Sequence, residues 1–456
     1  MRCLGLDLGS TTIKGAVLDL GMANLSHFHS EPFPGPNLNQ LALGHEVSLE
    51  KVMAATQAVL ARLIQTEPEA NDLFICSQMG GLVISNSRGI PYSPYLSWRD
   101  QRSLSEFSKG SSFLAEAEKR IGQKGLSNLG NELKAGTAST LLFWLDQNGL
   151  VPKGAVASSL GEWVVAQLAN KPISMHSSMA IGWLDLANDD WGYESFELLG
   201  LGKIKFPTLM RHISPIGNIQ IGGRTLRIYP ALGDQQCALF GTNLDDGELS
   251  VNASTGSQVS RLRSNFLPGP YQSRFYFDGK ILDTITHIPA GRSLNAIIDF
   301  LTEISRANGC TLDPWDYIKN ELKHTENAPP HGSNGLECGL SFFPGPLGEK
   351  GYLSGITLEN LSVRNLMVAA IESMAKGYRF CSEKLGPAHK WGGIVLSGGL
   401  AHSLPTLRER IGSLFEGIAI RETPGKEETL MGLLRIARKK LGLTKTNTEI
   451  DNLETI

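Results

Sequence analysis

Apolar and polar positions change their period along this chain, which predicts helices and strands in turn. Between 49 and 65 the apolar residues Val52, Val59 and Leu63 recur at helical spacing and fall on one face. Residues 72–77 then form a short apolar run, which predicts a buried strand. Because such switches recur along the sequence, we expect an α/β fold.

Further elements follow from the same pattern. Gly149 and Gly241 are suited to end two of the helices, since glycine adopts a helix C-cap conformation easily. The last helix ends in basic residues, which the helix dipole favours. The stretch 208–228 is only weakly patterned. The pattern predicts helices at 133–148, 161–168, 235–240 and 427–441, a helix from about 404, and a strand at 392–397.

The most informative feature is a strand–turn–strand pattern that occurs once in each half, at 4–15 and at 249–260. Each short β-rich run ends in a polar turn that can aim backbone N–H groups and hydroxyls at an anion. Two such hairpins suggest a nucleotide held between two halves. Phosphoryl transfer is therefore the leading hypothesis.

The length supports two halves, because 456 residues exceed what a single core organises. A turn-type sequence at 245–248 marks the expected boundary. We predict an N-terminal domain at 1–244, a C-terminal domain at 245–443 and a polar tail at 444–456.

Composition narrows the function classes. With 41% hydrophobic and 19% charged residues and a net charge of −3, the chain lacks the basic excess of a nucleic-acid-binding protein. No stretch nears the roughly 20 apolar residues of a membrane span, and the N-terminus is unlike a signal peptide. The six cysteines contain no Cys-x-x-Cys pair, so we expect reduced thiols and a cytoplasmic protein.

Two aspartates are candidates for the chemistry. Asp7 ends the first strand before the phosphate-type turn, where a carboxylate can hold Mg²⁺ and Lys14 can neutralise phosphate charge. The alternative is a turn-capping Asp with a solvated Lys. Asp234 follows Gly233 at the start of a helix and can act as a general base toward a hydroxyl. The alternative for Asp234 is a helix N-cap.

Two polar loops are candidates for a sugar site. They contain Gln78, Met79 and Gly80 in one loop and Trp98, Arg99 and Asp100 in the other. An aromatic face covers the C–H groups of a sugar, while polar side chains bind its hydroxyls. The alternative for the second loop is a surface loop with a salt-bridged Asp and Arg.

A glycine pair, Gly398 and Gly399, lies between a predicted strand and a predicted helix. Glycines there let the backbone approach a flat ring or a phosphate, although the same pair also suits an ordinary strand-to-helix turn. The histidines lack metal-ligand spacing, and the chain contains neither a nucleophile elbow nor a Walker A loop.

Together these motifs resemble the FGGY carbohydrate kinases, a branch of the actin-like ATPases, and most of all their sedoheptulokinase and xylulokinase members. The similar segments are the first phosphate motif (Asp7 to Lys14), the substrate region (Ser77 to Val83 and Trp98 to Arg102), the catalytic-base motif (Leu232 to Gln236), the second phosphate motif (Ser254 to Ser257), Gly351 to Ile356, Asn365 to Glu372, and the adenosine motif (Leu396 to Ser403). They cover nearly the whole chain in the family's order.

The resemblance implies two actin-like (ribonuclease H-like) α/β domains with an interdomain cleft for ATP, Mg²⁺ and a sugar. It implies phosphorylation of a ketose or polyol hydroxyl, with Asp234 as the general base and Asp7 beside Mg²⁺, in a protein that is often a homodimer. The implied substrate-facing residues are Gln78, Met79, Gly80, Trp98, Arg99, Asp100 and Asp234. The implied nucleotide-facing residues are Ser10, Thr11, Thr12, Lys14, Thr255, Gly256, Gly398, Gly399, Ala401 and Ser403.

Departures from the family pattern concern the substrate. Gly80 stands where xylulokinase-like members have a His, and the segment 141–145 lacks its usual Lys. Trp98 before Arg99 is similar to the glycerol and sedoheptulose branches. The loop at 78–81 is similar to the xylulose and sedoheptulose branches, so sedoheptulose and xylulose are the expected candidates.

Two other classes stay open at this point. One is a sugar- or nucleotide-binding regulator on the same scaffold that no longer catalyses, against which the presence of both Asp7 and Asp234 argues. The other is a general ATPase of the heat-shock chaperone type. The Trp98 loop and the lack of a peptide-binding β domain argue against that class.

Overall fold

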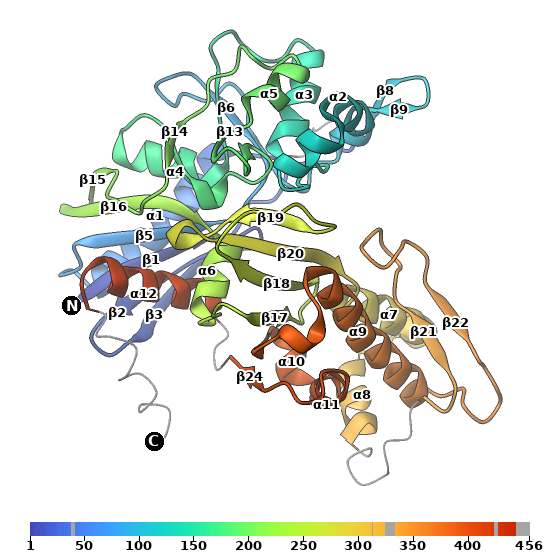
Figure 1. Cartoon of the computed structure of the whole chain (residues 1–456). Coiled ribbons are helices and arrows are strands. Elements are labelled where there is room, and N and C mark those ends of the chain that lie inside the picture. Colours follow the sequence, from blue (N-terminus) through green and yellow to red (C-terminus); the bar gives the residue numbers. More distant parts are fainter. Residues whose placement is uncertain (38–41, 312, 324–332, 424–426, 444–456) are drawn as a thin grey trace.

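The computed structural model describes residues 1–37, 42–311, 313–323, 333–423 and 427–443. They form a mixed α/β structure built on two six-stranded sheets, with a further body of helices and short strands at one end (Figure 1). The tail predicted at 444–456 lies outside the described residues.

The first sheet contains the first phosphate-type turn. Its strands run in the order β15 (Gly217–Ile221), β16 (Arg224–Gly233), β5 (Asp72–Ser77), β1 (Arg2–Leu8), β2 (Thr12–Asp19) and β3 (Asn24–Pro32). Three of them, β16, β5 and β1, are parallel neighbours, while β2 returns antiparallel to β1. Helices α1 (Leu49–Thr66) and α4 (Leu160–Ala169) pack on this sheet. The strand predicted at 72–77 and the helix predicted at 49–65 are confirmed.

The second sheet has the same arrangement about its own first hairpin. Its order is β19 (Gln272–Phe275), β20 (Ile281–Ile288), β18 (Ser257–Arg263), β17 (Glu248–Asn252), β23 (Gly393–Ser397) and β24 (Ile420–Glu422). As β1 does in the first sheet, β17 pairs antiparallel with the next strand and parallel with a later one. Both predicted strand–turn–strand units are therefore confirmed, each at the centre of its sheet.

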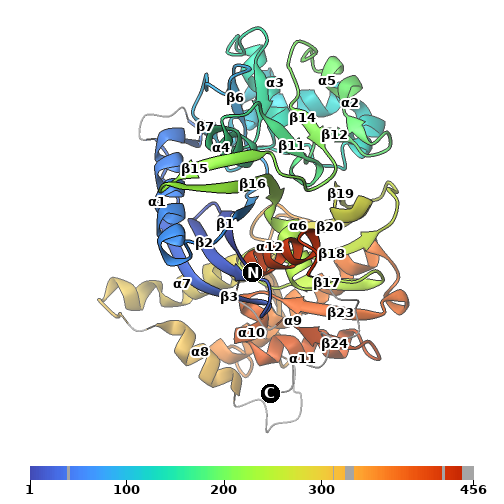
Figure 2. The same ribbon diagram turned by 90° about the vertical axis from the view of Figure 1, so that its left-hand side faces the viewer.

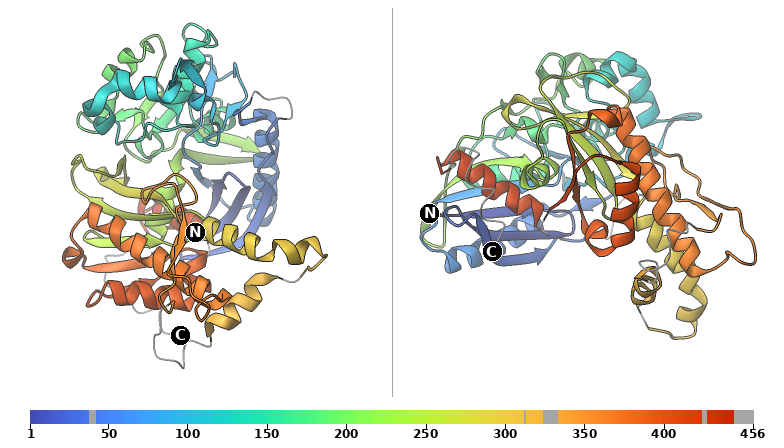
Figure 3. Two further views of the ribbon diagram at one scale, coloured as in Figure 1. Left: turned by 90° about the vertical axis from the view of Figure 1, so that its right-hand side faces the viewer. Right: turned by 60° about the horizontal axis from the view of Figure 1, so that its bottom comes forward.

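Helices from the second half of the chain cover the second sheet. Helix α9 (Val363–Leu385) lies against β18 and β20, and α11 (Pro405–Leu414) packs on α9 (Figure 3). The remaining helices here are α7 (Gly291–Ala307), α8 (Pro314–Lys323) and the short α10 (Gly399–Ser403). The helix predicted from about 404 is confirmed as α11, but α10 precedes it directly after the strand.

Two helices lie between the sheets, α6 (Asp234–Gly241) and α12 (Glu428–Lys440) (Figures 1 and 2). They touch backbone to backbone, because a Cβ on Gly241 would lie 2.1 Å from the Glu428 carbonyl oxygen and one on Gly432 would lie 1.9 Å from the Cys237 carbonyl oxygen. A shared apolar core joins both helices to the two sheets. The last helix therefore returns to pack beside the first sheet.

The segment between β5 and β15, residues 78–216, forms most of the third body and is called the inserted lobe below. Apart from α4, which packs on the first sheet, its α-helices are α2 (Phe113–Asn128), α3 (Ala138–Gln147) and α5 (Tyr193–Leu198), around an apolar core of their own. The helix predicted at 133–148 begins later than expected, at Ala138. The side chains of Thr137 and Thr140 both donate to the Lys134 carbonyl oxygen and close a turn there instead.

The shorter strands pair two by two. These pairs are β4 (Glu46–Val47) with β7 (Tyr95–Leu96), β6 (Val83–Ser85) with β10 (Val156–Ser158), β8 (Glu106–Ser108) with β9 (Ser111–Ser112), β11 (Ser174–His176) with β14 (Thr208–Met210), β12 (Leu184–Asp185) with β13 (Asp190–Trp191), and β21 (Glu337–Gly339) with β22 (Tyr352–Ser354). The weakly patterned stretch 208–228 thus contains three strand segments, one of which, β15, is a half-polar edge strand.

Candidate active site

The first sheet brings two carboxylates to the same edge. Asp7 and Leu232 both lie opposite Cys76, in the parallel register of β1, β5 and β16. Asp234 follows two residues after Leu232, where β16 turns into α6. Since the carboxyl ends of parallel strands meet at one edge, the two aspartates lie close together, and the Asp7 charge acts on Asp234.

The Asp7 carboxylate is buried, with 4% of the residue exposed. One oxygen, Oδ2, accepts a 2.7 Å hydrogen bond from the Thr429 hydroxyl and lies 3.6 Å from the Lys14 ammonium. The other oxygen, Oδ1, has no hydrogen-bond partner among the described residues. Burial raises the pKa of Asp7 above its ordinary value, and the charge of Lys14 opposes that rise.

This environment fits a divalent cation. A buried carboxylate with an unpartnered oxygen beside a phosphate-type turn is suited to Mg²⁺, which usually keeps several waters and binds phosphate oxygens as well. The described residues contain no group of three His, Cys, Asp or Glu side chains that would form a closed metal cage. Among the described residues, Asp7 could hold Mg²⁺, directly or through water.

Lys14 is tied to carboxylates rather than free in solvent. Its ammonium lies 2.5 Å from a Glu427 carboxylate oxygen as well as 3.6 Å from Asp7. The alternative of a solvated Lys does not describe this arrangement. Glu427 precedes α12, so this pair and the Thr429 bond both connect the first turn to the start of that helix.

Asp234 is the first residue of α6, and Gly233 takes the N-cap position. Its Oδ1 accepts a 2.7 Å hydrogen bond from the Gln235 N–H. The side chain keeps a small exposed area, as a base that meets a substrate requires. Burial and then the Asp7 charge raise the pKa of Asp234 to about 7. That value suits a general base near neutral pH.

The turn before Asp234 is supported from the inserted lobe. The Ser178 hydroxyl, in the 3₁₀ turn Ser177–Met179, accepts a 3.1 Å hydrogen bond from the Gly233 N–H. It also bonds His176 Nδ1 at 2.9 Å, while burial lowers the pKa of His176 to about 4 and keeps that ring neutral. The Ser178 carbonyl oxygen accepts a 3.0 Å bond from Gln236. No sequence motif marks Ser178 or His176, because their contacts are long-range.

The loop after β5 connects the first turn with the base. The Gln78 side chain is buried and donates to the Gly9 carbonyl oxygen at 3.4 Å. Met79 lies against Gly233, since a Cβ on that glycine would meet Met79 Sδ at 2.6 Å. Gly80 has a φ of 77°, and a Cβ there would lie 3.1 Å from Trp98 Cβ. The structure therefore brings Met79, Gly80 and Trp98 to the same region as Asp234.

Arg99 contacts both Trp98 and the first turn. The Arg99 guanidinium lies 5.3 Å from the centre of the Trp98 ring and donates to the Ser10 hydroxyl at 3.3 Å. Trp98 remains 38% exposed. An exposed aromatic face beside a cation and a phosphate-type turn can hold a polyhydroxylated molecule next to a phosphate.

Asp100 differs from its neighbours because its carboxylate is fully buried and fully engaged. It accepts bonds of 2.8 Å from Arg102 Nε and Nη2, 3.0 Å from the Arg102 N–H and 2.7 Å from the His45 N–H. The salt-bridged alternative describes this pair, although the pair lies inside the protein rather than at its surface. The role that these contacts indicate is to hold the shape of the Trp98 loop.

The second turn and the glycine pair lie side by side. Asn252 at the end of β17 is opposite Ser397 at the end of β23, and their side chains form a 3.0 Å hydrogen bond. Thr255 and Gly256 are exposed at the tip of the second turn. Gly398 has a φ of 94°, and a Cβ there would lie 2.4 Å from the Ala253 carbonyl oxygen.

The remaining residues that were predicted to face the nucleotide differ in how exposed they are. Gly399 has open space where a Cβ would be, Ser403 is exposed, and Ala401 is buried beneath them. The start of α12 joins this group to the first turn. The Glu428 carboxylate accepts bonds from the Thr423 hydroxyl at 3.0 Å and from the Gly398 backbone.

The residues at the start of α12, Glu427 to Thr429, are a further part of the site that the sequence prediction missed. Acidic residues at a helix start are common because the helix dipole favours them, so they gave no separate signal.

The sequence profile described as the FGGY family of carbohydrate kinases, N-terminal domain, matches residues 2–241. The chain belongs to the FGGY family of carbohydrate kinases. No curated protein matches the chain significantly by sequence.

Solved FGGY kinases share the fold over almost their whole length. The chain is similar to a gluconate kinase from Lactobacillus acidophilus (TM-score 0.82, 18% identity, 98% of this chain and 90% of that one). It is similar to a xylulose kinase from the same organism (0.79, 18%, 97% and 90%) and to a glycerol kinase from Plasmodium falciparum solved with ADP (0.79, 15%, 98% and 90%). At these identities the comparison shows the two-domain actin-like fold and leaves the substrate open.

Within the described residues, no helix is both long and apolar enough to cross a membrane.

Proposed function

We propose that this FGGY kinase transfers the γ-phosphoryl group of ATP to a hydroxyl of a ketose or polyol. The observation that carries the proposal is the placement of Asp7 and Asp234 at one sheet edge, beside the first phosphate-type turn. One carboxylate has a buried oxygen without a hydrogen-bond partner, which a cation would satisfy, and the other has a pKa of about 7. Phosphoryl transfer needs both functions within reach of one reacting group.

The reaction assigns separate tasks to these residues. Asp234 accepts the proton of the attacking hydroxyl as its oxygen bonds to the γ-phosphorus, while the bond to the β,γ-bridging oxygen breaks and ADP leaves. Lys14 and Arg99 supply positive charge near the first turn. Mg²⁺ held at Asp7 would neutralise phosphate charge. The protein therefore works mainly by positioning and charge neutralisation.

The nucleotide would lie between the two turns. Ser10, Thr11 and Thr12 form one turn and Thr255 and Gly256 the other. Backbone N–H groups and hydroxyls in such turns bind phosphate oxygens. Gly398, Gly399, Ala401 and Ser403 would lie against the adenosine, and the exposed Gly399 leaves room for a ring.

The sugar would lie over Trp98, between the Gln78–Gly80 loop and Asp234. Met79 and Gly80 would form its apolar side, and Arg99 would bind a hydroxyl or the transferring phosphate. Sedoheptulose and xylulose are the proposed substrates, and the similar structures add gluconate and glycerol as candidates. The partners are thus two small molecules, a sugar and ATP.

The test is ADP release by the purified protein with ATP and Mg²⁺ across sedoheptulose, xylulose, ribulose, gluconate, erythritol and glycerol. The control is Asp234→Asn, which keeps the shape of the side chain and removes the base. Strong stimulation of the wild type by one compound, lost in the control, would support the proposal. ATP binding without stimulation by any compound would favour the non-catalytic regulator instead.

A further inference from the structure

Gln235, the residue after Asp234, is hydrogen-bonded to the second sheet. The Gln235 amide nitrogen donates to Gln258 Oε1 at 3.1 Å and to Thr284 Oγ1 at 3.2 Å, and its amide oxygen accepts from Arg274 Nη1. Gln258, Arg274 and Thr284 come from β18, β19 and β20. Every polar atom of the Gln235 side chain is therefore bonded to the second sheet, while its backbone N–H bonds the Asp234 carboxylate.

Arg274, which bonds Gln235, also contacts the inserted lobe. Its Nε pairs with the Glu132 carboxylate, whose side chain is 2% exposed, while Arg274 itself is 10% exposed. Lys134 lies 4.0 Å from the same carboxylate. A buried charge of this kind is costly to leave without a partner. Arg274 is thus the side chain that touches the lobe and the residue beside the base at once.

The strand that carries Arg274 is docked on the lobe by its backbone. The Ser273 N–H donates to the Gly130 carbonyl oxygen at 2.9 Å, and Asn131 Nδ2 donates to the Tyr271 carbonyl oxygen at 2.8 Å. Gly130 has a φ of 71°, and a Cβ there would lie 2.0 Å from the Ser273 carbonyl oxygen.

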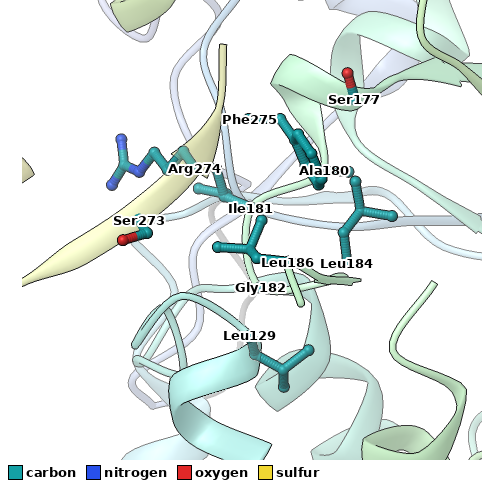
Figure 4. A pocket seen from close by; sticks show the side chains of 10 residues that line it. All are labelled: Leu129, Ser177, Ala180, Ile181, Gly182, Leu184, Leu186, Ser273, Arg274 and Phe275. Carbon is teal, nitrogen blue, oxygen red and sulfur yellow. The ribbon is translucent and has the colours of Figure 1, made fainter. Parts of the chain in front are cut away.

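A small space with room for about one water molecule lies between β19 and the lobe. Figure 4 shows β19 beside the lobe residues Ile181, Leu184 and Leu186, with the Arg274 side chain directed away from them. The docked strand thus fills this boundary while it sends its guanidinium toward Glu132 and Gln235.

We propose that Arg274 is a positioning residue that acts through Gln235 to hold the Asp234 carboxylate for proton abstraction. This inference rests on the proposed kinase function. The alternative explanation is that Arg274 only holds the inserted lobe and the second sheet together. The two explanations differ in whether the effect of Arg274 passes through the base.

The decisive experiment is a double-mutant cycle with Arg274→Met and Asp234→Asn, measured by kcat on the substrate that stimulates ADP release. We expect Arg274→Met alone to lower kcat by about 100-fold, the loss typical of a reacting group displaced by about 1 Å. In the Asp234→Asn background the same change should have less than about a 3-fold effect, because the group it positions is gone. An equal loss in both backgrounds would overturn the proposal.

The matched control is Asn131→Ala, which removes a contact of the docked strand without touching Gln235. Its effect on kcat, whatever its size, should be the same in both backgrounds. Arg274→Lys keeps the charge toward Glu132 and should recover part of kcat. Non-additivity in Asn131→Ala equal to that of Arg274→Met would also contradict a specific role for Arg274.

A readout without substrate separates this inference from the kinase function. In Arg274→Met, but not in Asn131→Ala, amide exchange of residues 233–236 should become faster while α4 stays protected. Unchanged exchange at 233–236 in a folded Arg274→Met protein would overturn the positioning role even if the kinase assay succeeds. Absence of activity in the wild type, with the exchange difference present, would instead count against the proposed function alone.

Discussion

The hydroxyl of Thr429, in the first turn of α12, donates a 2.7 Å hydrogen bond to the carboxylate of Asp7 at the end of β1. The two residues lie near opposite ends of the chain, and this bond fixes the start of α12 over the first phosphate-type turn. Because Asp7 is buried, the bond offsets part of the cost of keeping a charge there. The other carboxylate oxygen, Oδ1, is buried and has no hydrogen-bond partner among the described residues.

Replacing Thr429 should therefore weaken both the fold and the cation site. We expect Thr429→Val to lower the free energy of unfolding by about 2 kcal/mol, since a bond to a charged group is lost. Thr429→Ser should retain most of that stability. Urea unfolding measures the difference, and the Mg²⁺ concentration for half-maximal activity should rise in the Val variant only. Thr302→Val is the control, since that hydroxyl bonds its own helix backbone. Equal losses in both Val variants would contradict the role of Thr429.

Activity should depend on pH through Asp234. Burial raises its pKa to about 7, so the carboxyl is protonated and inactive as a base below that pH. We expect kcat/KM to rise about tenfold per pH unit below pH 7 and to level off above it. A rate profile at constant ionic strength from pH 5 to 9 measures this. A plateau that extends down to pH 5 would contradict the assignment of the base.

The same shift predicts that removing the base stabilises the protein. The folded-state pKa of about 7 exceeds the ordinary 3.8, so ionisation of Asp234 costs folding free energy. That cost is absent below pH 4, grows between pH 4 and 7, and is constant above. Asp234→Asn should therefore melt a few degrees higher than the wild type at pH 8. The difference should shrink toward pH 4, and a lower melting temperature at pH 8 would contradict it.

The glycine pair offers a matched test of the second turn. Gly398→Ala must bring a Cβ to within 2.4 Å of the Ala253 carbonyl oxygen at a φ of 94°, whereas Gly399→Ala meets no atom within 4 Å. We expect Gly398→Ala to lose about 2 kcal/mol or more of unfolding free energy and Gly399→Ala to lose almost none. If adenosine lies there, Gly399→Ala should still raise the KM for ATP. Chemical unfolding and ATP titration check the two parts separately.

Gly136 tests the support of the Trp98 loop. Its φ is 80°, and a Cβ there would lie 1.9 Å from the Trp98 carbonyl oxygen, while Gly149 has a φ of 69° and open space. Both Ala variants bear the left-handed strain of about 1 kcal/mol, but only Gly136→Ala must displace Trp98. We expect Gly136→Ala to raise the KM for the sugar at least tenfold and Gly149→Ala to leave it unchanged. Similar sugar KM values in the two variants would argue against a sugar over Trp98.

The parts of this structure that could be predicted from sequence are those fixed by near neighbours. The two strand–turn–strand units depend on short-range alternation and small polar turn residues, so they were predictable at 4–15 and 249–260. The start predicted for α3 was wrong because a turn closed by Thr137 and Thr140 takes the place of the first helical turn. Periodicity does not report such side-chain bonds.

The candidate site likewise contains residues that could be predicted from near neighbours and residues that could not. Asp7 and Asp234 stand next to recognisable turns, whereas their partners come from distant segments. Thr429, Ser178 and Arg274 reach the two aspartates or their neighbours only through tertiary packing, and their types are common in any sequence. The Asp100 carboxylate is bonded to Arg102, two positions away, which its sequence context did not indicate, and its contact with a sugar stays a prediction.

Helix α12 comes late in the sequence but packs on the first sheet. Folding around that sheet can therefore be completed only after α12 has been synthesised. During synthesis β1 and α6 are made before residues 428–440, which contact Asp7 and the apolar side of α6. A nascent chain that ends before α12 lacks the contacts of this helix with the first phosphate-type turn, and the apolar side of α6 stays exposed. A chain without the start of α12 therefore lacks the Glu427 and Thr429 contacts that join this helix to Lys14 and Asp7.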